Sequence, residues 1–388
     1  MVHDQNRRRP ASAAAAVHDA FDPTRVAQAR RVTGRSRAWL AERIGVSPAT
    51  VARLENGADR LRPDVLSRLA AALDVPPAFF RAGRMHTCLD PAEVHFRSVL
   101  SSQADQRNRA VGYAEQVSEL VWVLEKHVSM PLVNLPGWSG GELDAGTALP
   151  RDPVAAAAAL RAAWGMHPFK PVAHLVRQLE IRGIIVTTPD DDTLTAVDAF
   201  STAQLLRPLI VVTVNRHSDV YQHRFAVAHE LGHLVLHSHA APGNHRQERE
   251  ADTFAAEFLT PHAAMISSLP RRADLDALAD LREVWGTPTP SLLLRCIELG
   301  FLSEASFRRA QARLRDRGDR ANPDRPERVA EYPGERPSMI AESFAVASTS
   351  HRVSVTDLAR ELAWEPATVR RILGRPQQRS HLRLISER

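Results

Sequence analysis

Residues 224–237 read Arg-Phe-Ala-Val-Ala-His-Glu-Leu-Gly-His-Leu-Val-Leu-His, and this stretch decides how the middle of the chain folds. His229 and His233 are four residues apart, so a helix places both imidazoles on one face, one turn apart. An HExxH pentad alone also occurs by chance on surface helices, but apolar residues flank this one on both sides. Two histidines and a glutamate in a buried helix are costly unless a metal organises them. The stretch therefore predicts a metal-binding helix inside a domain.

A second helix, predicted over about 246–260, supplies the third ligand that such a metal site needs. We assign His229, His233 and Glu248 as the ligands of one zinc ion. Glu230 lies beside the metal as the general base that takes a proton from the attacking water. Asp252, one turn after Glu248, is the acceptor that orients a ligand histidine. The donor set favours zinc and leaves manganese open.

Several neighbouring residues are alternatives to these assignments. Glu250 is the fallback third ligand, although it points elsewhere on its helix. Three nearby histidines are interpreted as loop or surface residues: His237, His239 and His245. Tyr221 and His223 are candidates for stabilising the transition-state oxyanion, with a structural role favoured for each.

A helix-turn-helix pattern occupies residues 40–57. Leu40 and Ile44 lie four apart on one face, and Gly45 suits the left-handed end of the first helix. Ser47 is a good N-cap for the second helix, and Pro48 is tolerated at its first position. The residues expected to face DNA are Arg37, Ser47, Pro48, Ala49, Thr50 and Arg53. Residues 1–84 hold about fifteen arginines against eight acidic residues, an excess that favours contact with phosphate.

Both patterns resemble known families. Residues 224–237 and 248–261 resemble the ImmA/IrrE metallopeptidases, whose pattern is an HExxH helix, then E-x-x-A-N/D-x-F-A and a closing proline. The helix-turn-helix resembles XRE, or phage-repressor-type, DNA-binding domains. The resemblance implies a minimal zincin-like α+β domain and specific cleavage of a repressor protein. One departure is Thr260, where methionine is commoner before the proline.

The predicted fold class is multidomain α and α+β: an all-α helix-turn-helix domain, a zincin-like α+β peptidase domain with a small three-stranded sheet, and a helical C-terminal region. The strands are predicted over 183–188, 195–201 and 208–215, and residues 315–336 as a flexible linker. The predicted divisions are a disordered basic arm (1–22), the helix-turn-helix domain (23–84), a helical connector (85–150), the peptidase domain (151–265) and the C-terminal region (266–388).

Residues 358–372 repeat the pattern of 40–54 without a gap, including the tetrad Pro-Ala-Thr-Val. The segment 353–374 is therefore a candidate second helix-turn-helix. The other interpretation is a helical pair that completes the C-terminal region, with Trp364 replacing the usual turn residue.

Composition sets outer limits on the function. The 388 residues carry a formal net charge of +5, and the two cysteines, Cys88 and Cys296, are expected to be reduced. No stretch approaches the 18 or more apolar residues of a membrane span, so a cytoplasmic protein is expected. Its expected partners are double-stranded DNA and a repressor protein as peptide substrate, with a homodimer left open.

The predicted function is a DNA-binding zinc metalloendopeptidase that regulates transcription. The alternative is a transcriptional regulator whose zinc domain senses a ligand or partner without proteolysis. A complete catalytic set favours the first, because a sensor does not need Glu230.

Overall fold

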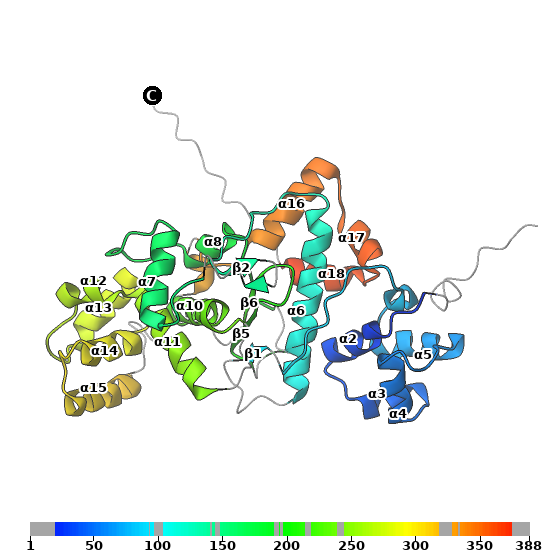
Figure 1. Cartoon of the computed structure of the whole chain (residues 1–388), viewed down its shortest axis with the longest axis horizontal. Coiled ribbons are helices and arrows are strands. Elements are labelled where there is room, and N and C mark those ends of the chain that lie inside the picture. The colour runs from blue at the N-terminus through cyan, green and yellow to red at the C-terminus, as the bar shows by residue number, and fades with distance from the viewer. Residues whose placement is uncertain are drawn as a thin grey trace, which may run out of the picture.

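A computed structural model describes most of the chain (Figure 1). The described residues are 20–92, 94–96, 104–139, 142–143, 148–189, 194, 197–213, 219–238, 244–317, 328–332 and 334–374. Within these ranges no helix is long and apolar enough to cross a membrane. Of the arm predicted over 1–22, residues 1–19 lie outside the described ranges. Cys88 and Cys296 are both free cysteines.

The N-terminal helices form the predicted helix-turn-helix. They are α2 (Thr24–Val32), α3 (Arg37–Ile44), α4 (Pro48–Glu55) and α5 (Pro63–Leu73), followed by the 3₁₀ helix η1 (Pro77–Phe80). Gly45 ends α3 in the left-handed conformation, with φ 67° and ψ 46°. The Ser47 hydroxyl caps α4 by accepting a hydrogen bond from the Thr50 amide at 3.1 Å. The turn chemistry expected from the sequence is thus present.

A long helix, α6 (Ala104–Glu125), holds the helix-turn-helix against the rest of the molecule. The Arg25 guanidinium donates to the Glu119 carboxylate at 2.6 Å, and Arg31 donates to Glu115 at 2.6 Å. Both pairs are buried where α2 packs on α6. At Gly112 a Cβ would lie 2.8 Å from the backbone nitrogen of Val32, so only glycine permits this close approach.

The central sheet has four strands in the order β1-β5-β6-β4. The predicted strands are β4 (Ile185–Thr187), β5 (Ala199–Thr202) and β6 (Leu209–Val212), with β4 parallel and β5 antiparallel to β6. The sequence did not predict β1 (His95–Phe96), which pairs antiparallel with β5. The region predicted as a helical connector therefore also contributes a strand, and it holds the hairpin of β2 (Trp138–Ser139) and β3 (Glu142–Leu143).

The two faces of the sheet belong to different hydrophobic cores. Phe200 and Val211 face the core that includes α6, the helix-turn-helix and the last helices. Ala199 and Val212 face the core of the peptidase region. This second core is formed with α7 (Pro153–Ala163), α8 (Leu175–Glu180), α10 (Val220–Leu236) and α11 (His245–Leu259).

A separate helical core follows the peptidase region. It consists of α12 (His262–Ser268), α13 (Leu275–Trp285), α14 (Thr289–Glu298) and α15 (Glu304–Arg317). These helices lie at the end of the molecule opposite the helix-turn-helix (Figure 1).

The prediction of a flexible linker over 315–336 is wrong at both ends. Residues 315–317 belong to α15. After residues 318–327, which lie outside the described ranges, the chain forms the 3₁₀ helix η3 (Val329–Glu331) and then buries Glu335. The Glu335 carboxylate accepts a hydrogen bond from the Leu175 amide at 2.9 Å and pairs with the Arg224 guanidinium. A buried ion pair therefore anchors this segment to α8 and α10.

The last helices are α16 (Met339–His351), α17 (Val355–Leu362) and α18 (Pro366–Leu373). The pair α17–α18 reproduces α3–α4: each helix has eight residues, and Ala363 takes the left-handed conformation of Gly45. It packs on α6, where the Arg371 guanidinium donates to Gln116 at 3.4 Å. The segment 353–374 is thus a helix-turn-helix in geometry, and DNA contact by it stays a prediction.

Candidate metal centre

The HExxH residues lie in the buried middle of α10. Asp219 caps the start of the helix, where its carboxylate accepts hydrogen bonds from two first-turn amides at 2.9 and 3.1 Å. His229, Glu230 and His233 are only 1%, 0% and 1% exposed. The helix is therefore buried, as its flanking apolar residues predict.

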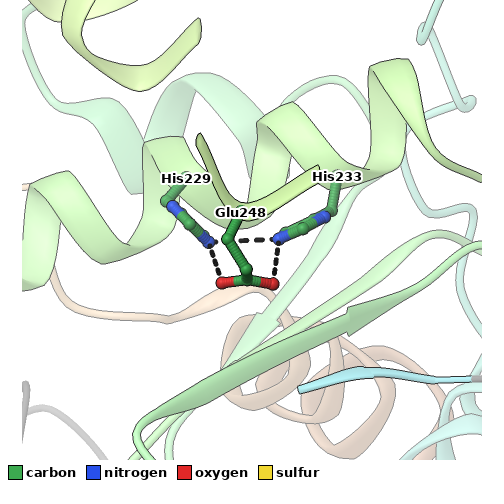
Figure 2. A group of neighbouring side chains, drawn as sticks. All are labelled: His229, His233 and Glu248. Atoms are coloured by element: carbon green, nitrogen blue, oxygen red, sulfur yellow. Dashed lines mark hydrogen bonds and ion pairs between the residues drawn. The ribbon is translucent and has the colours of Figure 1, made fainter. Parts of the chain in front are cut away.

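Three candidate ligand side chains converge on one point (Figure 2). The Nε2 atoms of His229 and His233 are 3.1 Å apart, and the Glu248 carboxylate oxygens lie 3.5 and 3.4 Å from them. Ligand atoms about 2.0–2.2 Å from a tetrahedral zinc ion lie about 3.3–3.6 Å from one another. The donor types fit zinc, and the three separations lie within about 0.2 Å of this range. These three residues are the one such group among the described residues.

Close packing of α11 on α10 brings Glu248 to the histidines. A Cβ at Gly232 would lie 3.1 Å from the Phe254 ring and 3.3 Å from the Ala251 backbone. The two helices can approach this closely because Gly232 and Ala251 are small. Fixing α11 there places the first turn of α11, with Glu248, over the face of α10 that carries His229 and His233.

The electrostatics of Glu248 suit a metal ligand. Burial alone would raise its pKa, but hydrogen bonds and charge interactions with His229 and His233 lower the pKa of Glu248 to about 2. The side chain is therefore a carboxylate near neutral pH, the form that binds a metal.

Asp252 contacts the other ring nitrogen of His229. Its Oδ1 atom lies 2.8 Å from His229 Nδ1. A carboxylate at Nδ1 fixes the ring and keeps Nε2 free of a proton for a metal. This is the contact that the sequence predicts for Asp252.

His237 occupies a different place from the one that the sequence predicts. It is 5% exposed rather than a surface residue, and its Nδ1 atom lies 3.1 Å from Nδ1 of His233. On its other side, Nε2 lies 3.0 Å from an oxygen of Glu250. Glu250 therefore meets His237 rather than the point where the candidate ligands converge. His245 is exposed, and His239 lies outside the described residues.

Spacing contains a signal for His237 that the sequence analysis missed. His229, His233 and His237 follow one another at intervals of four, so all three share a helix face. Burial lowers the pKa of His237, against the opposing hydrogen bond and charge of Glu250, and thereby favours the neutral imidazole.

Glu230 accepts a hydrogen bond from the sheet. The buried Ser201 hydroxyl on β5 donates to Glu230 Oε2 at 2.8 Å. Helix spacing in the sequence does not indicate this contact of Ser201, because the contact joins a strand to a helix 29 residues away.

Tyr221 and His223 lie near the start of α10. His223 is six residues before His229, about 9 Å along the helix axis. Its Nε2 atom is 3.1 Å from the Glu335 carbonyl oxygen, and the Tyr221 and Tyr332 hydroxyls are 3.4 Å apart. These contacts join α10 to the segment after residue 327, which agrees with the structural role favoured from the sequence.

The residues expected to face DNA lie on and beside α4, each at least partly exposed. Two of them form ion pairs: Arg37 pairs with Glu55 at 2.6 Å, and Arg53 pairs with Asp59 at 2.9 Å. About half of each arginine side chain remains accessible to phosphate. The remaining candidates are Ser47, Pro48, Ala49 and Thr50.

Comparison with known families gives two matches. Residues 182–296 match the IrrE N-terminal-like domain of the peptidase M78 family, and residues 24–81 match a helix-turn-helix domain. A search of curated protein sequences found no significant match.

Fold and comparisons together define the class: a DNA-binding helix-turn-helix domain joined to a metallopeptidase-like domain. The match of residues 182–296 to the IrrE N-terminal-like domain agrees with the resemblance found in the sequence.

Proposed function

We propose that this protein is a DNA-binding zinc metalloendopeptidase that regulates transcription by cleaving a repressor protein at a specific site. The observation that carries the proposal is the convergence of three candidate ligands, His229 and His233 on α10 and Glu248 on α11, together with the buried carboxylate of Glu230 on α10. Zinc bound by His229, His233 and Glu248 would supply a Lewis acid that polarises the scissile carbonyl and acidifies the attacking water.

The chain's own residues supply the proton transfers. Glu230 takes a proton from the attacking water and delivers it to the leaving amine nitrogen, so one group acts first as base and then as acid. The Ser201 hydroxyl holds one oxygen of Glu230 in place. Asp252 fixes the orientation of His229.

The helix-turn-helix would bring this chemistry to DNA. Its buried ion pairs with α6 link it to the helix that packs against the sheet beside the site. A protein bound at an operator meets a repressor bound nearby at a high effective concentration. We place the protein in the cytoplasm, where operator DNA and repressor are both found.

A second candidate is a regulator whose zinc domain senses a ligand or partner without proteolysis. The burial of His229, Glu230 and His233 supports it, because a peptide bond must reach these atoms to be cleaved.

Cleavage of a helix-turn-helix repressor encoded beside this gene distinguishes the two functions. We expect the zinc-loaded wild type to cut it at one site, with Glu230→Gln losing cleavage but keeping zinc. The exposed Glu304→Gln is the matched control and should cut like the wild type. Cleavage by Glu230→Gln at the wild-type rate would refute the role of Glu230. No cleavage by zinc-loaded wild type would favour the sensor.

A further inference from the structure

His233 is contacted at both ring nitrogens. Its Nε2 atom faces His229 and Glu248, where the candidate ligands meet. Its Nδ1 atom faces His237 at 3.1 Å. Because His237 lies on the far side of the His233 ring, it cannot share a metal with Nε2 of that ring.

The hydrogen positions along this contact follow from the metal site. An imidazole that binds a metal through Nε2 carries its hydrogen on Nδ1. His233 Nδ1 therefore donates to Nδ1 of His237, which must accept with its lone pair. A neutral His237 then carries its own hydrogen on Nε2, and Glu250 lies 3.0 Å from that atom to accept it.

Glu250 is itself held in place from outside. The Arg246 guanidinium donates to its Oε1 at 2.7 Å, while Oε2 faces His237. His233 thus donates to His237 and His237 donates to Glu250, while Arg246 donates to Glu250 from the opposite side.

We propose that His237 is a positioning residue that orients His233 for the metal and fixes its tautomer, with Glu250 anchoring His237. The inference rests on the proposed zinc site. It gives His233 a support equivalent to the one that Asp252 gives His229.

Burial accounts for the use of a histidine here instead of a carboxylate. Asp252 is about half exposed, so water solvates its charge. Position 237 is 5% exposed, and an ionised carboxylate there would lose most of its hydration. A neutral imidazole accepts the hydrogen bond from His233 without carrying a charge itself. Its own N–H donates to Glu250, and the negative charge then lies on this better solvated carboxylate.

Zinc affinity, measured by competition with a chromogenic chelator, tests the proposal. His237→Leu keeps the apolar bulk but removes the acceptor, and we expect zinc binding about 10–100-fold weaker. His237→Asn retains an oxygen that can accept from His233 and should lose less. His245→Leu, at the exposed start of α11, is the matched control and should bind zinc like the wild type. The visible spectrum of the cobalt-substituted protein should change in His237→Leu and not in the control.

Equal zinc affinity in His237→Leu and the wild type would overturn the proposal. Thermal unfolding of the metal-free proteins shows whether this variant folds. If it does not fold, Glu250→Ala replaces it in the test, because it keeps the imidazole and alters a partly exposed side chain. We expect about tenfold weaker zinc binding from Glu250→Ala, and no change would again overturn the proposal. A wild type that binds no zinc would instead contradict the proposed function itself.

Discussion

Ser201 and Glu230 form the contact on which the proposed proton transfers depend most closely. The hydroxyl is buried on β5 and donates to one carboxylate oxygen at 2.8 Å. A hydrogen bond to a charged group contributes about 1.5–3 kcal/mol. Without it, the glutamate keeps its place on α10 but loses a fixed orientation toward the attacking water.

Ser201→Ala is therefore expected to lower kcat about 10–100-fold, the rate equivalent of that hydrogen bond. Zinc content should stay unchanged, because Ser201 is not a ligand. The matched control is Thr202→Val on the opposite face of the same strand, which should retain most activity. Steady-state cleavage kinetics provide the measurement, and an equal loss in both variants would indicate damage to the strand rather than to Glu230.

Among single residues, the sequence predicts those site residues that helical spacing places on one face of a helix. Intervals of four place His229 beside His233, and the face of the second helix presents Glu248 and Asp252 to them. The structure brings these residues together, and their roles as ligands and support remain predictions. Ser201 and the role of His237 were missed. The Ser201 contact depends on how a strand packs on a helix. The role of His237 depends on the burial of its side chain, which the polar residues around it in the sequence do not indicate.

The elements that build the site are α10 and α11, which cross at Gly232. A Cβ there would lie 3.1–3.3 Å from Phe254 and Ala251, so a larger side chain must push the helices apart. Since Glu248 reaches the histidines only through this packing, the helix separation controls the third ligand.

Gly232→Val is expected to weaken zinc binding at least tenfold and to destabilise the fold by about 1–3 kcal/mol through overpacking. Gly232→Ala should have a much smaller effect, because alanine favours the helix and its neighbours need shift only slightly. Chelator competition and thermal unfolding check both variants. Equal zinc affinity in Gly232→Val and the wild type would show that the helix spacing does not control the site.

Element types were largely predictable from periodicity, whereas two short segments were not. The strand β1 has two residues, too few for an alternating pattern, and exists because Phe96 packs against Phe200 at 5.2 Å between ring centres. The segment around Glu335 lies in an Arg- and Pro-rich stretch that reads as linker. An ion pair between Glu335 and Arg224, more than a hundred residues away in the sequence, holds this segment in place.

Across the whole molecule, α6 connects the regions. It packs against α2 through buried ion pairs and also contacts α17. It reaches the sheet through Tyr113, whose hydroxyl lies 2.8 Å from that of Thr187. A buried ion pair has little net effect on the free energy of unfolding while both partners remain. Removal of one partner leaves the other charge buried and unpaired, which destabilises the fold.

Glu119→Ala is expected to destabilise the protein by about 3–5 kcal/mol, because Arg25 would remain buried without its carboxylate. The matched control is Glu361→Ala, which removes the exposed pair with Lys126, just after the end of α6, and should cost less than about 1 kcal/mol. Denaturant unfolding measures both changes. Similar losses in the two variants would contradict the importance of burial.

The two helix-turn-helix segments lead to different expectations for DNA. Arg53→Ala should weaken DNA binding and reduce the dependence of log affinity on log salt by about one. Arg371, at the equivalent position of α18, donates to Gln116 on α6, so Arg371→Ala should leave DNA affinity unchanged. Salt-dependent binding titrations test both. A loss from Arg371→Ala would assign DNA contact to the second segment.

The zinc content of purified protein after dialysis against metal-free buffer tests the metal centre most directly. We expect about one zinc ion per chain for the wild type and for the exposed control Glu304→Ala. The Glu248→Ala protein, which should fold but lacks the third ligand of the site, should retain almost no zinc. Wild-type protein without zinc, or Glu248→Ala with full zinc, would contradict a metal centre formed by His229, His233 and Glu248.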